Sequence, residues 1–290
     1  MADAAIAVPR PAPDTGWLWV LPPLSVIGLL FFYPLFLIAR QGLTDGKSGV
    51  TFEHFAAVLR TRQFHSAMWN TIEIALMSSA GCVVLGFVVA LILSFVPFPG
   101  SREIARFIDT FIALPTFLMA LAFTFIYGSA GVLNGMLMDV FGNKAPPVDF
   151  VYSMWGVVLA EVTVFTPFVL RPLLAAFSLI DTAQIEVASS LGAGPWRIIR
   201  QIIFPAALPA LLAGGSLCLL LTVNEFGIIL FIGAKGVITL PLLVYDKAIQ
   251  EGDYTPACVI AVINVVLSLS LYSLYRVVIA HFGGRNAGVV

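Results

Sequence analysis

Apolar runs alternate with shorter polar connections along this chain of 290 residues. Six runs have the length that a helix needs to cross the hydrocarbon core of a bilayer, about 17 residues or more. In chain order they are residues 16–39, 71–96, 111–127, 155–179, 206–232 and 256–280. Inside a bilayer every backbone N–H and C=O needs a partner within the protein, which a helix supplies. The sequence therefore predicts an all-α, polytopic membrane protein with six transmembrane helices.

The composition supports a chain that is solvated mostly by lipid. Hydrophobic residues make up 60% of the sequence and charged residues only 11%, whereas soluble domains carry about 25% charged residues. The net charge of −1 gives no reason to expect a nucleic-acid partner. The cysteine and histidine residues have no metal-site spacing: Cys82, Cys218, Cys258, His54, His65 and His281. We therefore predict no metal and no cofactor.

The segments outside the predicted spans set the boundaries and the orientation. Residues 1–15 are rich in proline and alanine and are predicted to form a disordered tail, and residues 281–290 form a second short tail. Six spans place both termini on one side of the membrane. Among the short connections, lysine and arginine favour the side that holds the termini and the polar segment 181–209. The positive-inside rule then predicts that this side is cytoplasmic.

The polar segment 181–209 has the pattern of two short helices with a break between them. Asp181 with Gln184 three residues later predicts a capping box and a helix that starts at Thr182. Gly192 is placed to end this helix in the left-handed conformation. Pro195 suits the first position of a second helix, because it has no N–H to leave unbonded there. The pattern predicts a rigid knob at the membrane surface.

The second short helix carries basic residues and ends near two prolines. Arg197 and Arg200 are three residues apart and share one helical face. Pro205 and Pro209 are predicted to bend the segment into the fifth span. Leu114-Pro115 is similarly predicted to kink the third span.

Three charged residues fall within the predicted spans, where an ionised group costs about 2.5–3.5 kcal/mol. Arg171 is deep enough to reach the inner interface, so it is predicted to act as an anchor there. Glu161 and Glu225, the latter beside Asn224, are predicted either to line a translocation path or to bond across helices.

Glu186-Val187-Ala188, Gly192-Ala193 and Phe204-Pro205 resemble the signature E-A-A, three residues, G-A and a closing L-P. This signature belongs to permease subunits of ABC importers. Valine replaces the second-place alanine and phenylalanine replaces the leucine, and both replacements are apolar. The resemblance implies a type I importer permease fold, with residues 16–66 as a first helix and a long periplasmic loop, and 67–280 as a permease core of five helices.

In that family the knob is a pair of coupling helices that docks into a cleft of a cytoplasmic ATP-binding subunit. The resemblance thus implies a coupling loop at residues 181–205. The residues expected to act there are Glu186, Ala188, Gly192, Ala193, Trp196, Arg197 and Pro205. Trp196 is the apolar anchor. Glu161, Asn224 and Glu225 are the candidates for the path. In similar permeases the part of helix five that corresponds to Asn224 and Glu225 lines it.

The resemblance also implies the partners. They are cytoplasmic ATP-binding subunits, a periplasmic substrate-binding protein and a second permease subunit, with a heterodimer favoured over a homodimer. The chain has no phosphate-binding P-loop, so it is expected to be a transport subunit of the bacterial inner membrane and not an enzyme. ATP hydrolysis is expected in the partner.

Further resemblance reduces the number of candidate substrates. The whole chain is similar to permeases for iron(III), sulfate or thiosulfate, polyamines and phosphonates. Residues 113–117, 161–167 and 249–255 look most like a permease for 2-aminoethylphosphonate. A secondary transporter would show inverted repeats and coupling residues, and an integral-membrane enzyme would show paired aspartates or a Ser/His/Asp set at membrane depth. The sequence shows neither pattern.

Overall fold

The computed structural model describes residues 19–44, 49–142 and 145–283. It confirms six helices that are long and apolar enough to cross a membrane. They are Leu21–Leu43, Arg62–Phe95, Thr116–Phe141, Met154–Phe177, Pro195–Val223 and Tyr254–Val277. The third of these consists of two helices, Thr116–Tyr127 and Val132–Phe141, with a turn between them. Within the described residues the fold is all-α, with a single isolated bridge between Thr44 and Val50. The predicted tail 1–15 lies outside the described residues, as does most of the tail 281–290.

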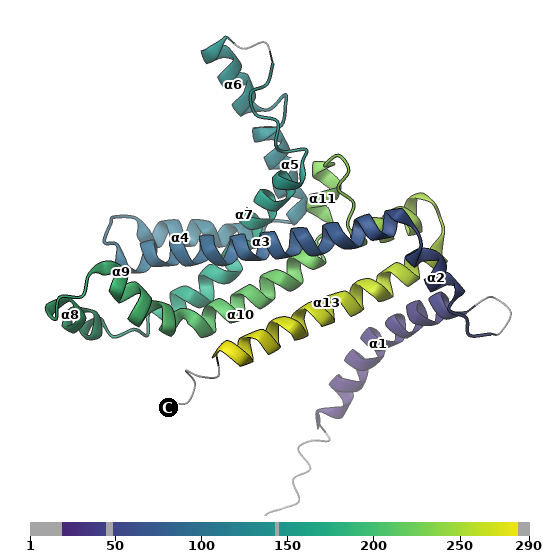
Figure 1. Cartoon of the computed structure of the whole chain (residues 1–290), viewed down its shortest axis with the longest axis horizontal. Helices are drawn as coiled ribbons and strands as arrows, with labels where there is room; N and C mark the ends of the chain where they lie inside the picture. Colours follow the sequence, from purple (N-terminus) through teal and green to yellow (C-terminus); the bar gives the residue numbers. More distant parts are fainter. Residues whose placement is uncertain (1–18, 45–48, 143–144, 284–290) are drawn as a thin grey trace, which may run out of the picture.

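The bundle is built around α7 (Met154–Phe177), which packs between α3 (Arg62–Phe95) and α10 (Phe204–Val223) (Figure 1). Glycines let these helices approach closely, as is common in membrane proteins. A Cβ atom added at Gly214 would lie 2.8 Å from the Cα of Val169, and one at Gly86 would lie 3.0 Å from the Cβ of the same valine. The backbones of α7 and α10 are therefore in contact through Gly214.

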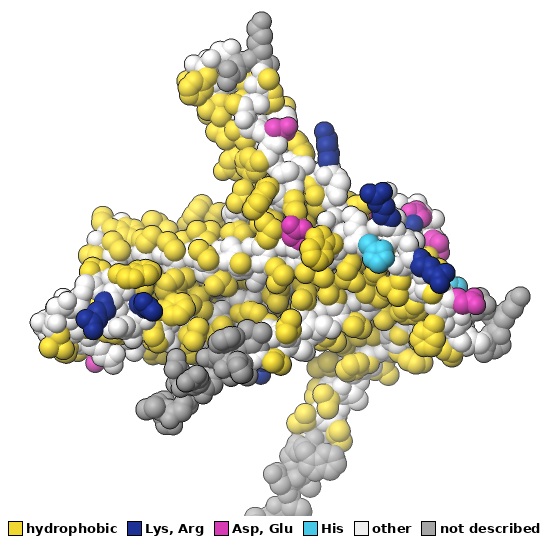
Figure 2. Space-filling model, in the orientation of Figure 1, with side chains coloured by type: hydrophobic (Ala, Val, Ile, Leu, Met, Phe, Trp, Pro, Cys, Tyr) yellow, Lys and Arg dark blue, Asp and Glu magenta, His cyan; other side chains and the backbone are white. Residues whose placement is uncertain are grey.

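α13 (Tyr254–Gly283) runs beside α10, and α1 (Leu21–Leu43) leans away from the bundle (Figure 1). α1 meets α13 at Gly42, where an added Cβ would lie 3.2 Å from the side chain of Val259. Hydrophobic side chains cover most of the face in Figure 2, and the charged ones are concentrated toward the two ends of the bundle. This distribution suits a protein whose middle is surrounded by lipid.

The second span begins earlier than predicted. α3 starts at Arg62, after Thr61 accepts a hydrogen bond on its side-chain oxygen from the N–H of Phe64 (3.3 Å). The connection predicted over 40–70 therefore contains the short α2 (Glu53–Leu59) and the first turns of α3. This stretch was predicted to be a loop because its first turns contain polar residues such as Asn70. Asn70 instead donates to the carbonyl of Ile238 (3.0 Å).

The third span is broken where a kink was predicted. α4 (Ser101–Thr110) and the 3-10 turn η2 (Phe111–Ala113) end at Leu114, which is extended before Pro115, and α5 (Thr116–Tyr127) then starts in a new direction. A residue before proline is driven out of the helical region, which explains the break. α5 and α6 (Val132–Phe141) project away from the bundle (Figure 1).

The fifth span is also broken. A continuous helix over 206–232 was predicted, but α10 ends at Val223 and α11 (Gly227–Ile232) follows after residues 224–226. The two broken spans touch at their breaks. A Cβ atom added at Gly227 would lie 3.0 Å from the Oγ1 of Thr116 and 3.5 Å from the N of Phe117. The start of α11 therefore packs directly on the start of α5.

The remaining short helices, α12 (Leu240–Tyr245) and the π-helical η4 (Asp246–Gln250), connect α11 to α13. Leu240 and Leu243 of α12 are buried in a small apolar cluster with Phe64 of α3 and Val259 of α13. This cluster holds the end of the bundle that is remote from residues 181–205.

Candidate functional site

The first half of the predicted coupling loop is α8 (Thr182–Ser190). The carboxylate of Asp181 accepts the N–H of Ala183 (2.9 Å), so the predicted N-cap is confirmed. Gln184 gives only its backbone N–H to the carbonyl of Asp181 (3.1 Å). No side-chain bond from Gln184 back to Asp181 occurs among the described residues. The predicted reciprocal capping box is therefore wrong, and a simple N-cap takes its place.

Gly192 ends α8 in the left-handed conformation, with φ of 83°. The N–H of Gly192 donates to the carbonyl of Ser189 (2.9 Å), and the N–H of Ala193 donates to the carbonyl of Ala188 (3.0 Å). These two bonds together form a Schellman motif. The expectation from sequence that Gly192 stops the helix is confirmed, and three of the signature positions form the stop.

The second half of the loop differs from the prediction. Gly194 caps α9 (Pro195–Ile198) with Pro195 at its first position, as expected. The helix then continues through a π-helical turn, η3 (Ile199–Ile203), into α10 without a break. There is no separate second helix, because α9 is the extended end of the fifth span.

The π-helical turn explains how the helix passes Pro205. The N–H of Phe204 donates five residues back, to the carbonyl of Ile199. Pro205 has no N–H to continue the ordinary ladder, and such turns are a common way to absorb a disruption. Pro205 therefore lies in a continuous helix that joins α9 to α10.

The knob formed by α8 and α9 is held at one end of the molecule (Figure 1), where α8 packs mainly on α9. Its exposed surface is apolar. Leu191 is 82% exposed, Trp196 is 74% exposed and Val187 is 58% exposed. Glu186 is exposed on α8, and Arg197 on α9 donates from Nε to the side-chain carbonyl of Gln201 (3.1 Å). Exposed apolar groups with a charged rim are typical of a protein interface.

A cavity of about 450 Å³ lies beside the break in the fifth span. Its walls come from η2, α5, α7 and α10, and its polar lining residues are Thr116, Asn224 and Glu225. Glu225 is only 7% exposed. Its Oε1 accepts the N–H of Ile228 (2.8 Å) at the start of α11. Two of the three predicted path residues therefore lie together on one cavity.

Asn224 also connects the break between α10 and α11 to α13 by hydrogen bonds. Its Nδ2 donates to the carbonyl of Leu220 (2.8 Å), and its Oδ1 accepts from the Nδ2 of Asn264 (3.1 Å) and the Oγ of Ser268 (3.4 Å). Our sequence interpretation missed Asn264 and Ser268. The available signal was two polar residues four positions apart in an apolar span, because such residues share a helical face.

Glu161, the third predicted path residue, lies apart from this cavity. It is fully buried on α7, with Ser78 and Cys82 of α3 and Glu225 as its polar neighbours. The Sγ of Cys82 lies 3.8 Å from the carbonyl oxygen of Val162, which shows how closely α3 and α7 pack here. Neither carboxylate oxygen of Glu161 has a hydrogen-bond partner among the described residues. It is buried inside the bundle and does not line the cavity beside Asn224 and Glu225.

Arg171 makes an ion pair that the sequence did not predict. Its Nε lies 2.6 Å from the Oδ1 of Asp109, which is near the end of α4. The prediction missed this ion pair because it connects residues 62 positions apart. The available signal was the presence of one charge of each sign near the ends of two neighbouring spans. The pair joins α4 to α7 about one helical turn from the cavity.

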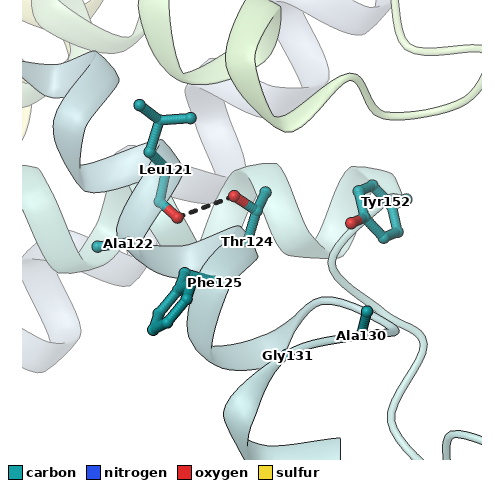
Figure 3. Close-up of a pocket in the computed structure, with 7 residues that line it drawn as sticks. All are labelled: Leu121, Ala122, Thr124, Phe125, Ala130, Gly131 and Tyr152. Carbon is teal, nitrogen blue, oxygen red and sulfur yellow. Dashed lines mark hydrogen bonds between the residues drawn. The ribbon is translucent and has the colours of Figure 1, made fainter.

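A second cavity, of about 600 Å³, lies at the elbow between α5 and α6 (Figure 3). Thr124 donates its hydroxyl to the carbonyl of Leu121 (2.9 Å) at its wall, and Tyr152 closes one side. No charged side chain lines it. The cavity at residues 224–226 is therefore the stronger candidate for a substrate site.

The family match and the similar proteins are all membrane components of transport systems. Residues 82–283 match the family described as "Binding-protein-dependent transport system inner membrane component". The chain is 62% identical over 269 residues to the "Putative 2-aminoethylphosphonate transport system permease protein PhnU" of Salmonella typhimurium strain LT2, which covers 93% of this chain and 94% of that one. It is 30% identical over 214 residues to the "Probable sulfate transport system permease protein cysT" of Helicosporidium, covering 72% and 76%.

Among solved structures, a bacterial ABC transporter involved in the import of the acidic polysaccharide alginate has a similar fold. The TM-score is 0.79 at 18% sequence identity, over 93% of this chain and 94% of that chain. This likeness concerns the fold alone.

Proposed function

This chain belongs to the family of binding-protein-dependent transport system inner membrane components, and on that premise we propose that it is the 2-aminoethylphosphonate permease of an ABC importer. It is a multi-pass protein of the inner membrane. The observation that carries the substrate is the 62% identity to the permease named for 2-aminoethylphosphonate transport, over nearly the whole of both chains. The sulfate permease is 30% identical over a shorter stretch, so sulfate is the weaker candidate.

Residues 181–205 are the coupling loop in this proposal. Three features support the assignment: the hydrogen-bonded stop at Gly192, the exposed Trp196, and the uninterrupted helix from Pro195 to Val223. A knob that deforms easily cannot pass on a displacement, whereas a capped helix joined to a span can. Movement of an ATP-binding subunit is transmitted through α9 and η3 to α10.

The partners follow from the same premise. The chain forms half of a pathway in its 67–280 core, and a second permease subunit, in a heterodimer, supplies the other half. Two cytoplasmic ATP-binding subunits hydrolyse ATP and a periplasmic binding protein delivers the substrate. Both termini and the coupling loop lie in the cytoplasm, while the segment between α1 and α3 lies on the periplasmic side. The excess of lysine and arginine in the short connections on the side of the termini supports this orientation.

Uptake of isotopically labelled 2-aminoethylphosphonate tests the proposal. The cells lack their own phosphonate importers and express this permease with its ATP-binding subunit, second permease and binding protein. Uptake that requires every component supports the proposal. Uptake of labelled sulfate, with none of the aminophosphonate, would contradict it and favour the substrate of the more distant relative.

A further inference from the structure

The interface between α3 and α7 contains three buried side-chain oxygens that have no hydrogen-bond partner among the described residues. They are both carboxylate oxygens of Glu161 on α7 and the hydroxyl oxygen of Ser78 on α3. Both residues are 0% exposed. A buried polar group without a hydrogen bond costs free energy, and a buried charge without a partner costs far more. The substrate cavity does not relieve this cost, because neither residue lines it.

The packing of the two helices brings Ser78 and Glu161 together. A Cβ atom added at Gly81 would lie 2.6 Å from the Cγ2 of Val162, and the Sγ of Cys82 lies 3.8 Å from the carbonyl oxygen of Val162. Glu161 directly precedes Val162, and Ser78 lies one helical turn before Cys82 on the same face of α3. Ser78 and Cys82 are accordingly polar neighbours of Glu161. The unpartnered hydroxyl and the unpartnered carboxyl group thus face each other across a closely packed interface.

No cationic side chain reaches the carboxyl group of Glu161. It makes no ion pair among the described residues, and its ionisable neighbours are Cys82 and Glu225, neither of which can carry a positive charge. Arg171 lies ten residues further along the same helix, about 15 Å away along its axis, and is paired with Asp109. Ionisation of Glu161 would therefore bury a charge without a counter-ion and add repulsion from Glu225.

We propose that Glu161 is a neutral carboxylic acid in the folded permease, and that its proton joins α7 to Ser78 of α3. A neutral carboxyl group has one O–H donor and one carbonyl acceptor, and a serine hydroxyl can also donate and accept. The Glu161 O–H donates to the Oγ of Ser78, and the Ser78 O–H donates back to the carbonyl oxygen of Glu161. This reciprocal pair satisfies all three oxygens. An ionised carboxylate has acceptors only, so one of its oxygens would stay without a donor.

This site binds a proton and not a metal ion or the substrate. Calcium and magnesium ions take about six oxygen ligands or more, and the part of the chain that the structure describes contains no group of three or more His, Cys, Asp or Glu side chains that could hold a metal. Glu225, by contrast, lines the cavity. The proposal therefore separates the two buried acids: Glu225 faces the cavity, whereas Glu161 holds two helices together. It goes beyond the proposed function and does not depend on which substrate is carried.

Infrared difference spectroscopy tests the protonation of Glu161 directly. The complex of permeases and ATP-binding subunits is reconstituted in lipid at neutral pH, and the spectrum of each variant is subtracted from that of the wild type. We expect a carboxylic acid C=O band in the wild type that Glu161→Gln removes. Ser78→Ala should shift this band to higher frequency, because the carbonyl loses a hydrogen bond. Glu225→Gln identifies the signal of the neighbouring acid. Glu103→Gln, in an exposed ion pair on α4, is the control and should remove a carboxylate band only.

Transport provides a second readout. Glutamine keeps a donor and an acceptor for Ser78, so an assembled Glu161→Gln complex should import 2-aminoethylphosphonate like the wild type. Loss of a carboxylate band in Glu161→Gln, or an assembled variant without uptake, would overturn the proposal. If this variant does not assemble, Ser78→Ala decides: a shifted acid band supports the pair and an unchanged spectrum overturns it. A wild-type complex that imports no aminophosphonate would overturn the proposed substrate alone, because the spectra do not depend on transport.

Discussion

The backbone N–H of Ala193 donates a hydrogen bond to the carbonyl of Ala188 across the turn that ends α8, at 3.0 Å. Both residues belong to the signature by which the chain resembles ABC importer permeases. The bond requires the left-handed backbone of Gly192 between them. The Gly-Ala pair of the signature is therefore explained by backbone geometry, independently of what docks on the knob.

Replacement of Gly192 by alanine is expected to loosen this turn. A residue with a Cβ costs about 1–2 kcal/mol in the left-handed conformation. The last turn of α8 should then exchange its amide hydrogens faster by about tenfold, measured by hydrogen exchange with mass spectrometry. Gly194→Ala is the control, because Gly194 has φ of −72° and no atom near its added Cβ. Equal exchange in both variants would mean that the stop does not depend on Gly192.

Replacement of Trp196 by alanine is expected to weaken the assembly with the ATP-binding subunit. Trp196 is an exposed aromatic residue on the knob, and a buried tryptophan anchor is typically worth about 2 kcal/mol or more in an interface. Affinity of the detergent-solubilised permease for the ATP-binding subunit should therefore fall by more than about tenfold. Trp155→Ala removes another exposed tryptophan (61%) at the start of α7 and should leave this affinity unchanged. The reverse pattern would place the interface elsewhere.

Asn224 and Asn264 are expected to act as one unit. Asn224→Ala removes the acceptor of the Asn264 amide, and Asn264→Ala removes one of the two side-chain donors to the Oδ1 of Asn224. Interhelical bonds of this kind contribute about 0.6 kcal/mol on average and at most about 1.7 kcal/mol. The double variant should destabilise the protein by less than the sum of the single variants. Thermal unfolding in detergent measures all four proteins of the cycle. Strictly additive losses would mean that the 3.1 Å contact contributes no coupling energy.

Gly214→Ala is expected to destabilise the bundle, because its Cβ would lie 2.8 Å from the backbone of Val169. Overpacking of this kind costs about 1–3 kcal/mol. Gly135→Ala adds the same methyl group inside α6, where no atom lies within 4 Å. Alanine is the better helix former, so this control should leave the midpoint of thermal unfolding unchanged or raise it. A tolerated Gly214→Ala would show that α7 and α10 separate easily.

The parts of the site that sequence predicted are those set by neighbouring residues. Asp181 and Gly192 each bond to residues within about one helical turn. An aspartate at an N-cap and a glycine at a left-handed helix end can therefore be recognised from the sequence alone. The break at 224–226 was not predicted, since Phe226 and Gly227 continue an apolar run. What separates α10 from α11 is tertiary packing: Asn224 bonds to α13 and Gly227 fits against Thr116.

The six spans were predicted because bilayer length and hydropathy determine them. Their ends were less well predicted wherever capping or a proline decided the boundary. Thr61 starts α3 nine residues before the predicted position 71, with polar side chains that bond within the protein. The ion pair of Asp109 with Arg171 joins residues that only the folded bundle brings together, and no local pattern contains it.

The ratio of substrate imported to ATP hydrolysed tests directly whether residues 181–205 couple the permease to ATP hydrolysis. It is measured in proteoliposomes that contain this permease, its second permease, the ATP-binding subunits and the binding protein, with and without Gly192→Pro. Proline cannot adopt the left-handed backbone of Gly192. We expect an assembled complex whose basal ATP hydrolysis persists, while stimulation of hydrolysis by the loaded binding protein and substrate uptake are both lost. An unchanged ratio and unchanged stimulation would contradict the assignment of residues 181–205 as the coupling element.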